Sequence, residues 1–287
     1  MPQTINTNLV SLNAQRNLST SQSALAVSMQ RLSSGLRVNS AKDDAAGLAI
    51  AERMHTQVRG MNVAMRNAND GISMAQVGEG ALGKVSDMLQ RMRELAVQAA
   101  NGTNTAADRT SLNDEYLALA RESARTLGGT QFNGQNILAT TLTSIFQVGA
   151  NTSATLDQIQ VNAFDWTQSA TITTAVGADV GADPTTSIAG SDGSFALASM
   201  AAIDSAIDAI NSQRAAFGAV QNRFENVIST LMVSSENQSA ARSRIMDADY
   251  AAETAALSRA QILQQAGNAM VAQANQLPQQ VLSLLQR

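Results

Sequence analysis

Apolar residues recur every three or four positions between residues 57 and 100, which is the pattern of one face of an α-helix. The stripe consists of Val58, Met61, Met65, Ala68, Ile72, Ala75, Leu82, Val85, Leu89, Met92, Ala96 and Ala99. A helix of this length, more than about 60 Å, cannot bury its stripe against itself. The pattern therefore predicts a rod that needs partner helices of matching length.

The same helical period returns late in the chain, where the sequence predicts a second long helix over 199–244. Its apolar positions are Met200, Ile203, Ile207, Ile210, Phe217, Phe224, Val227 and Leu231. A shorter helix is predicted over 105–128, because Thr105 and Asp108 have the spacing of a capping pair. We expect both helices to pack against the rod.

The two ends of the chain combine apolar repeats with almost no charge. Residues 1–30 contain one charged side chain, Arg16, and residues 260–286 contain none. A solvated helix face is usually charged, so these faces indicate contact with other protein. Candidate assembly positions are Leu25, Met29, Leu32 and Leu36 near the start, and Leu263, Met270, Leu277 and Leu284 near the end.

The remaining stretches predict bends and a little β-structure. Small residues and mixed charges over 33–56 predict a bend, and a second bend is expected near 247–249. Short β-like runs predict a hairpin within 143–161. Residues 163–198, rich in Thr, Ser, Ala, Gly and Asp, predict a small β or loop insertion on the surface.

These elements predict a mainly α fold, a long antiparallel helical hairpin or coiled-coil bundle built from both chain ends. We expect a terminal coiled-coil domain from residues 1–42 and 247–287. We expect a rod domain with the β-hairpin from residues 43–162 and 199–246, and a short exposed insertion at 163–198.

Composition narrows the class of protein. Aromatic residues are 3% of the chain, whereas a globular enzyme core usually contains more. A net charge of −4 with two lysines gives no broad basic surface for nucleic acid. There is no cysteine, no apolar run long enough to span a membrane, and no signal-peptide pattern at the start. We expect a cytosolic protein, or one exported by a route that needs no such signal.

No group of residues in the sequence has the pattern of a catalytic site, and we expect no cofactor or metal. His55 is the only histidine, so a histidine-based zinc site or triad is excluded. Asp43 and Asp44 point in different directions on a helix and suit a cap or salt bridge. The Gly78–Gly83 stretch matches a nucleotide-binding pattern in letters alone, without a preceding strand.

One edge of the rod differs from the rest. Arg91, Glu94 and Gln98 are spaced three and four apart and share an outward edge, with Leu95 alongside. By physical chemistry alone this edge is an ordinary surface salt bridge, worth less than about 1 kcal/mol.

Several motifs in this order resemble those of bacterial flagellin. They are Asn8–Arg16, Leu32–Ile50, Gln131–Gly134, Arg244–Tyr250 and Pro278–Leu285. The likeness covers about residues 1–160 and 199–287, and the central segment departs most. It implies a subunit that polymerises with itself into the flagellar filament for swimming, with terminal helices in an inner tube and long helices in an outer tube.

The resemblance also implies partners and a location. It implies export through the flagellar type III apparatus with a chaperone, contact with hook-associated and cap proteins, and an extracellular filament. A host Toll-like flagellin receptor would read Arg91, Glu94 and Leu95, with Glu115 on the next helix; Met92 departs from the usual Val or Ile and is expected to face the rod stripe. Tail positions that resemble those bound by the chaperone and a cytosolic inflammasome sensor are Val281, Leu282, Leu284 and Leu285.

Two other classes of protein stay open from the sequence. A hook–filament junction protein shares the terminal architecture, but matches the 33–47 segment less completely. A cytosolic coiled-coil adaptor would carry charged residues at solvent positions, which 260–286 lacks.

Overall fold

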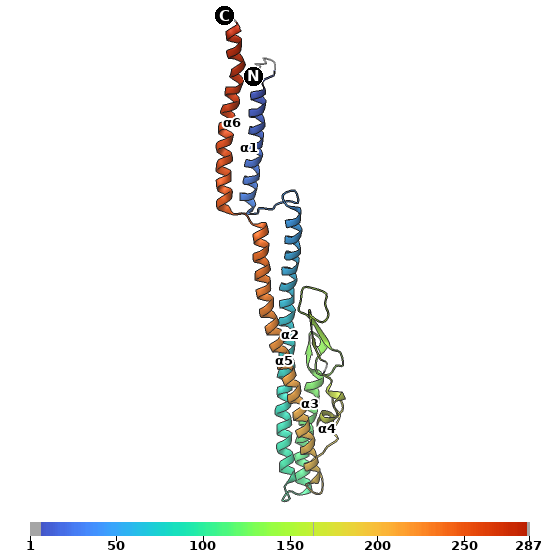
Figure 1. The fold of residues 1–287 in the computed structure, drawn as a ribbon. Coiled ribbons are helices and arrows are strands. Elements are labelled where there is room, and N and C mark those ends of the chain that lie inside the picture. The colour runs from blue at the N-terminus through green and yellow to red at the C-terminus, as the bar shows by residue number, and fades with distance from the viewer. Residues whose placement is uncertain (1–6, 163, 286–287) are drawn as a thin grey trace. The chain divides into compact units, whose positions relative to one another are not determined.

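A computed structural model of the chain describes residues 7–162 and 164–285, with side chains described as far as Gln276 (Figure 1). In order the elements are α1 (Leu9–Ser34), α2 (Ala45–Ala100), α3 (Ala106–Gly129), β1 (Gln131–Phe132), β2 (Gln135–Asn136), β3 (Ser144–Gln147), β4 (Gln158–Val161), η1 (Trp166–Gln168), α4 (Ala170–Val176), α5 (Ser194–Met246) and α6 (Tyr250–Leu285). The predicted fold class is confirmed: long helices from both chain ends pack together, and the described strands form small antiparallel hairpins.

Contacts divide the chain into two units, one made of residues 1–56 with 236–287 and the other of residues 57–235. In the second unit α5 packs along α2 by placing phenylalanine rings over glycines. A Cβ atom added to Gly71 would lie 2.5 Å from the ring of Phe224. One added to Gly78 would lie 2.9 Å from the ring of Phe217. The two pairs are seven residues apart on each helix, so they fix the register of this helix pair.

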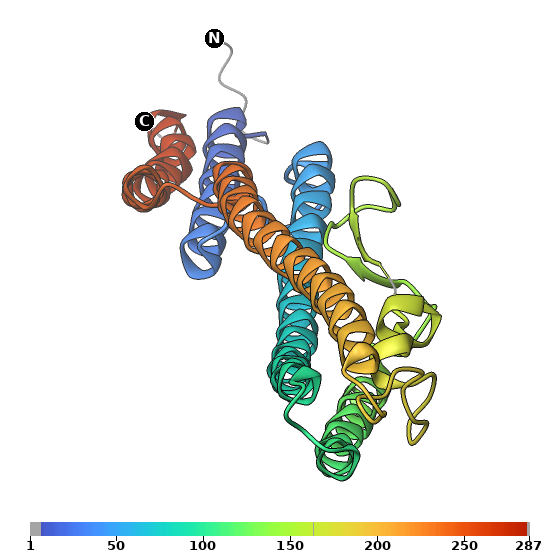
Figure 2. The same ribbon diagram turned by 90° about the horizontal axis from the view of Figure 1, so that it is seen from below.

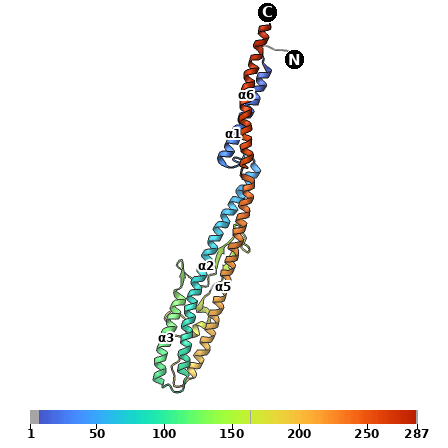
Figure 3. The same cartoon turned by 90° about the vertical axis from the view of Figure 1, so that its left-hand side faces the viewer.

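The rod lies between two partners, as predicted, with α3 on one side of α2 and α5 on the other (Figure 3). The core they share contains large, fully buried side chains: Leu82, Leu89, Met92, Tyr116, Leu127 and Ile203. The predicted cap of α3 is confirmed. The Thr105 hydroxyl accepts the Asp108 N–H at 3.2 Å, and the Asp108 carboxylate accepts the Thr105 N–H at 2.9 Å.

The β3–β4 hairpin, predicted within 143–161, lies against α2 (Figure 2). The side-chain amide of Asn67 donates to the Gln147 carbonyl at 2.9 Å. Phe146 meets Phe224 edge to face, with ring centroids 5.5 Å apart. The hairpin therefore closes one end of the apolar core.

The segment 163–198, expected to be a β or loop insertion on the surface, also contains short helical elements and buried side chains. The described residues of this segment form η1 and α4 rather than strands. Ile172, Val176 and Ile188 are completely buried. Asn113 of α3 accepts the Ile188 N–H at 3.0 Å, which ties this segment to α3.

Both long helices begin earlier than predicted, because nearby carboxylates satisfy their first N–H groups. The Asp44 carboxylate accepts the Gly47 N–H at 2.8 Å, and α2 begins at Ala45 rather than at residue 57. The Asp192 carboxylate accepts the Ser194 N–H at 3.0 Å, at the start of α5. The charge cluster that predicted a longer bend therefore includes a helix cap.

In the unit formed by the two chain ends, α1 and α6 run side by side (Figure 1). Each predicted bend is found: α1 ends at Ser34 and is followed by Gly35, whose φ of 71° is left-handed, and α5 ends at Met246 before α6 begins at Tyr250. Arg37 donates to the Ile245 carbonyl at 2.7 Å and so ties the two bends together. None of the described helices is long and apolar enough to cross a membrane.

Leu36 differs from the sequence expectation. It follows the end of α1 and packs with a small cluster around Val38, Ala51 and Met246. Leu36 therefore lies in the bend and is not part of the apolar stripe of α1.

Candidate assembly surface and the exposed edge of the rod

The α1–α6 pair has a seam of small and polar residues. The least exposed positions of α1 include Ser11, Ala14, Leu18, Ser21, Leu25, Ser28 and Leu32. Those of α6 include Leu257, Ala260, Gln264, Gly267, Val271 and Ala274. In both helices the steps alternate between three and four, as in a coiled coil. Hydropathy alone does not reveal this seam, because few of its members are strongly apolar.

Larger apolar side chains lie outside this seam. Leu9 is 68% exposed, Leu263 51% and Met270 56%. A groove of about 330 Å³ runs beside the seam, between Leu18 of α1 and Leu263 and Met270 of α6. Exposed apolar area of this kind marks an interaction surface.

The candidate assembly positions from the sequence thus separate into two groups. Leu25 and Leu32 are half-buried in the seam, whereas Met29, Leu263 and Met270 are exposed. The remaining candidates lie outside the described side chains: Leu277, Val281, Leu282, Leu284 and Leu285.

The edge predicted from Arg91 joins two helices. The Arg91 guanidinium donates to Glu115 of α3 through Nε at 3.0 Å and Nη2 at 2.9 Å. Its Nη1 donates to Glu94 at 2.9 Å. Hydrogen bonds to Glu94 and then Glu115 raise the pKa of Arg91 above its usual value. All three side chains are about half exposed or more, so the cluster is a solvated ion-pair network.

Leu95 does not belong to this edge, and the expectation that it faces outward is wrong. Its side chain is 1% exposed and packs in the core with Met92, Ala96 and Ala99. The buried face of the rod is wider than the predicted stripe, because it also includes Met74 and Leu95. Met92 is fully buried, as expected for a residue facing the stripe.

One buried residue that sequence reasoning missed is Arg109. It is 4% exposed, and its guanidinium donates to the carbonyl oxygens of Ala99 at 2.9 Å, Ser191 at 3.1 Å and Asn101 at 3.2 Å. It therefore ties the end of α2 and the segment before α5 to α3. A single arginine in a polar stretch gives no sequence signal for such a role.

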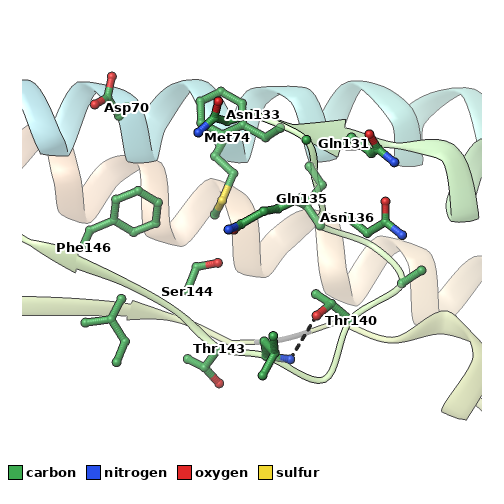
Figure 4. Close-up of a pocket in the computed structure, with 16 residues that line it drawn as sticks. Asp70, Met74, Gln131, Asn133, Gln135, Asn136, Thr140, Thr143, Ser144 and Phe146 are labelled. Carbon is green, nitrogen blue, oxygen red and sulfur yellow. Dashed lines mark hydrogen bonds between the residues drawn. The ribbon is translucent and has the colours of Figure 1, made fainter.

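A larger hollow of about 1200 Å³ lies between α2 and the β1–β2 turn (Figure 4). Amide and hydroxyl side chains such as Gln135 and Ser144 line it, together with Met74 and Phe146 (Figure 4). Asp70 is the one ionisable side chain among its lining residues. The lining residues of the hollow include no histidine or lysine that could activate one of these hydroxyl groups as a nucleophile.

Long amphipathic helices, a buried rod core and an exposed apolar pair of chain ends together define a fibrous structural protein. Models of the N-terminal and C-terminal helical regions of bacterial flagellin match residues 5–143 and 200–285. The chain belongs to the bacterial flagellin family.

Two flagellins match this chain over nearly its whole length. A flagellin of Halalkalibacterium halodurans is 46% identical over 282 residues, covering 98% of this chain and 99% of the relative. A flagellin of Bacillus subtilis is 42% identical over 319 residues with the same coverage. The crystal structure of Bacillus cereus flagellin is 36% identical with a TM-score of 0.48, covering 58% of this chain and 88% of the other.

The chain is therefore a structural subunit of the extracellular flagellar filament, which serves motility, and it is not an enzyme. The predictions of family, filament function, polymerisation and location are confirmed. The adaptor alternative is wrong, and identity along the full length of flagellins decides against a junction protein.

Proposed function

We propose that the α1–α6 pair drives polymerisation, with residues 1–42 and 247–287 forming the inner core of the filament. Residues 43–162 and 199–246 form the outer core, and 163–198 lie nearest to solvent. The observation that carries this proposal is the exposure of Leu263 and Met270 on a helix stretch without charge. Covering such a face with a neighbouring subunit removes apolar area from water and so lowers the free energy of the assembled state.

Seeded elongation tests the assembly role. A chain that ends at Ala260 should fail to extend filament fragments, while circular dichroism still reports the helices of the rod. A full-length Leu263→Ala, Met270→Ala variant should elongate more slowly. Its matched control replaces two exposed polar residues of the same helix, Gln261→Ala and Gln265→Ala. Filaments from the truncated chain, or equal rates for the two double variants, would contradict the proposal.

We propose, second, that a host Toll-like flagellin receptor reads the edge formed by Arg91, Glu94 and Glu115 in the monomer. The support is the pair of hydrogen bonds from Arg91 Nε and Nη2 to Glu115 Oε1, which holds charges from α2 and α3 in one solvent-accessible array. Charges arranged in this way provide specificity at an interface. Leu95 contributes by packing the helix beneath the edge, since its own side chain is buried.

A receptor reporter assay on monomeric protein tests this role. Arg91→Ala should lower signalling at least about tenfold, which is the loss expected for a central arginine at an interface. Arg93→Ala is the matched control, because Arg93 is equally exposed and pairs with Asp204 of α5 instead. Equal losses for the two variants would show that signalling follows stability rather than this edge.

The tail has two further proposed roles. We propose that an export chaperone and a cytosolic inflammasome sensor bind Val281, Leu282, Leu284 and Leu285, and that the chain leaves through the type III export apparatus. In the assembled flagellum, hook-associated and cap proteins contact the filament ends. The support is the apolar, uncharged sequence of the tail. Alanine at all four positions should abolish chaperone capture and reduce secretion, whereas alanine at Gln279 and Gln280 should not.

A further inference from the structure

All the sulfur of this chain is in methionine, because the sequence has 12 methionines and no cysteine. Among the methionines that the structure describes, three are exposed: Met29 at 56%, Met232 at 59% and Met270 at 56%. In contrast, Met92 is completely buried and Met74 is 6% exposed. The first three side chains are therefore accessible to an oxidant in solution, whereas the core shields the other two.

Met270 lies in the groove beside the α1–α6 seam, together with Leu18 of α1 and Leu263 of α6. Met232 lies on α5 in the other unit of the chain. Two methionines of nearly equal exposure therefore lie on different surfaces, and the surface around Met270 is the one assigned above to a neighbouring subunit.

Oxidation to the sulfoxide changes a methionine side chain from apolar to polar. Hydrogen peroxide transfers one oxygen atom to Sδ, so that the sulfur is oxidised by two electrons and the peroxide is reduced to water. The new oxygen accepts hydrogen bonds, whereas the original thioether is suited to apolar contacts.

We propose that Met270 is an oxidation site of the monomer, at which a sulfoxide slows incorporation into the filament. This site depends on the proposed function, in which a neighbouring subunit covers the groove. To be covered, a sulfoxide has to lose the water bound to its oxygen, and that loss opposes assembly. The monomer itself stays folded, because Met270 is mostly outside the seam that holds α1 against α6.

Polar side chains in the groove limit the size of this effect. Asn13, Asn17 and Ser21 of α1 line the groove with Met270. An amide that donates to the sulfoxide replaces one water molecule and lowers the cost of covering it. Burying a polar group without a partner disfavours an equilibrium by a factor of about 5 to 150. With amides in the groove we expect the lower end, a loss of about fivefold.

Two variants of the full-length chain isolate the site. Met29→Leu with Met232→Leu leaves Met270 as the exposed methionine of the described residues, and Met29→Leu with Met270→Leu leaves Met232 instead. Leucine keeps a similar volume and has no sulfur to oxidise. The half-buried methionines are the same in both proteins, so their oxidation cancels in the comparison.

Each protein is treated as a monomer with hydrogen peroxide, freed of oxidant and then elongated on wild-type seeds. Mass spectrometry gives the fraction of sulfoxide at each methionine, so the two proteins are compared at equal conversion of Met270 and Met232. In both, Met92 should react at least about tenfold more slowly than the exposed methionine. Circular dichroism should report the same helix content before and after treatment.

The result is the ratio of the elongation rates of treated and untreated samples of the same protein. With Met270 converted, this ratio should fall about fivefold, and with Met232 converted it should stay near one. Methionine sulfoxide reductases for both epimers should restore the rate, because they reverse no other damage. Equal losses in the two proteins, or an unchanged rate with Met270 fully oxidised, would overturn the inference.

A second comparison covers the case in which a double variant does not elongate before treatment. Wild type should lose about fivefold on oxidation, and the single variant Met270→Leu should lose much less. The Leu263→Ala, Met270→Ala variant described above tests the groove without any oxidant. If that variant elongates at the wild-type rate, the proposed function fails. If it elongates slowly while oxidation of Met270 has no effect, the assembly surface stands and the oxidation site alone is wrong.

Discussion

The two long helix pairs of this flagellin solve the problem of packing in opposite ways. Along α2 and α5, large rings fill the spaces over Gly71 and Gly78, and the bulky apolar side chains are inside. Along α1 and α6, serines, alanines and a glycine form the seam, and Leu263 and Met270 are outside. The rod pair thus buries its apolar surface within one chain, whereas the terminal pair keeps much of it available for other chains.

This difference separates stability from assembly. Changes in the α2–α5 core should act on the folded monomer, whereas changes on the outer face of α1–α6 should act on the polymer. The predictions below test that separation, beginning with the largest expected effect.

Removing a central ring of the rod core should give the largest loss. Phe224→Ala should lower the free energy of unfolding of the monomer by about 3–5 kcal/mol, because it leaves a cavity beside Gly71 and Phe146. Urea denaturation of the full-length monomer measures this. Leu263→Ala, in contrast, should change it by less than about 0.5 kcal/mol and yet slow elongation. If both variants lost a similar amount of unfolding free energy, stability and assembly would not be separated between the α2–α5 core and the outer face of α1–α6.

Arg109→Met should have the next largest effect, a loss of about 2–3 kcal/mol. The substitution leaves the buried carbonyl of Ala99, and the partly buried carbonyls of Ser191 and Asn101, without their charged donor. Urea denaturation again measures the loss, with Arg93→Met as an exposed control that is expected to cost much less. A cost for Arg109→Met as small as that of the control would show that the three carbonyls need no charged donor.

A single methyl group at Gly71 should cost about 1–3 kcal/mol by crowding the ring of Phe224. Gly80 provides the control, because an added Cβ there has open space within 4 Å. Gly80→Ala should stabilise the helix by up to about 1 kcal/mol, since alanine is the better helix former. Thermal melts of the two variants should shift in opposite directions, and shifts of the same sign would exclude the ring-over-glycine packing.

The smallest effect is expected from the cap of α3 and depends on pH. Hydrogen bonds from the Thr105 side chain and then its backbone lower the pKa of Asp108 below the ordinary aspartate value of about 3.9. The cap therefore contributes fully above pH of about 3.9 and is lost as the pH falls through the lower folded value. Asp108→Asn should lower the Tm near pH 7, and the difference from wild type should vanish in strong acid. If the difference in Tm between Asp108→Asn and wild type did not change with pH, the Asp108 carboxylate would be excluded as the source of that difference.

The sequence allowed the rod to be predicted because its core consists of strongly apolar residues such as Leu82 and Leu89 at helical spacing. It did not reveal the α1–α6 seam, because Ser28, Ala260 and Gly267 give no hydropathy signal and their burial depends on the partner helix. Leu95 was misplaced for a related reason. A stripe of fixed width does not show how far a second partner, α3, extends the buried face.

The short helix α4 and the buried side chains of the central segment were not predicted, because the composition of the segment is that of a loop. Some of its apolar residues, such as Ile172 and Ile188, are nevertheless buried by contacts with distant parts of the chain. Asn113 and Arg109 hold the backbone of this segment through carbonyl and amide groups that any residue possesses. Contacts to backbone groups of this kind leave almost no pattern in the sequence.

The rings of Phe217 and Phe224 over Gly78 and Gly71 also bear on how the rod resists mechanical load. Sliding α5 along α2 by one helical turn, about 5.4 Å, would push the ring of Phe224 from Gly71 onto a residue with a side chain, such as Ala75. Two such obstacles in series oppose shear through steric repulsion, which rises steeply over fractions of an ångström. The subunit therefore resists sliding of its two long helices along each other, because Gly71 and Gly78 admit the rings of Phe224 and Phe217 in one alignment.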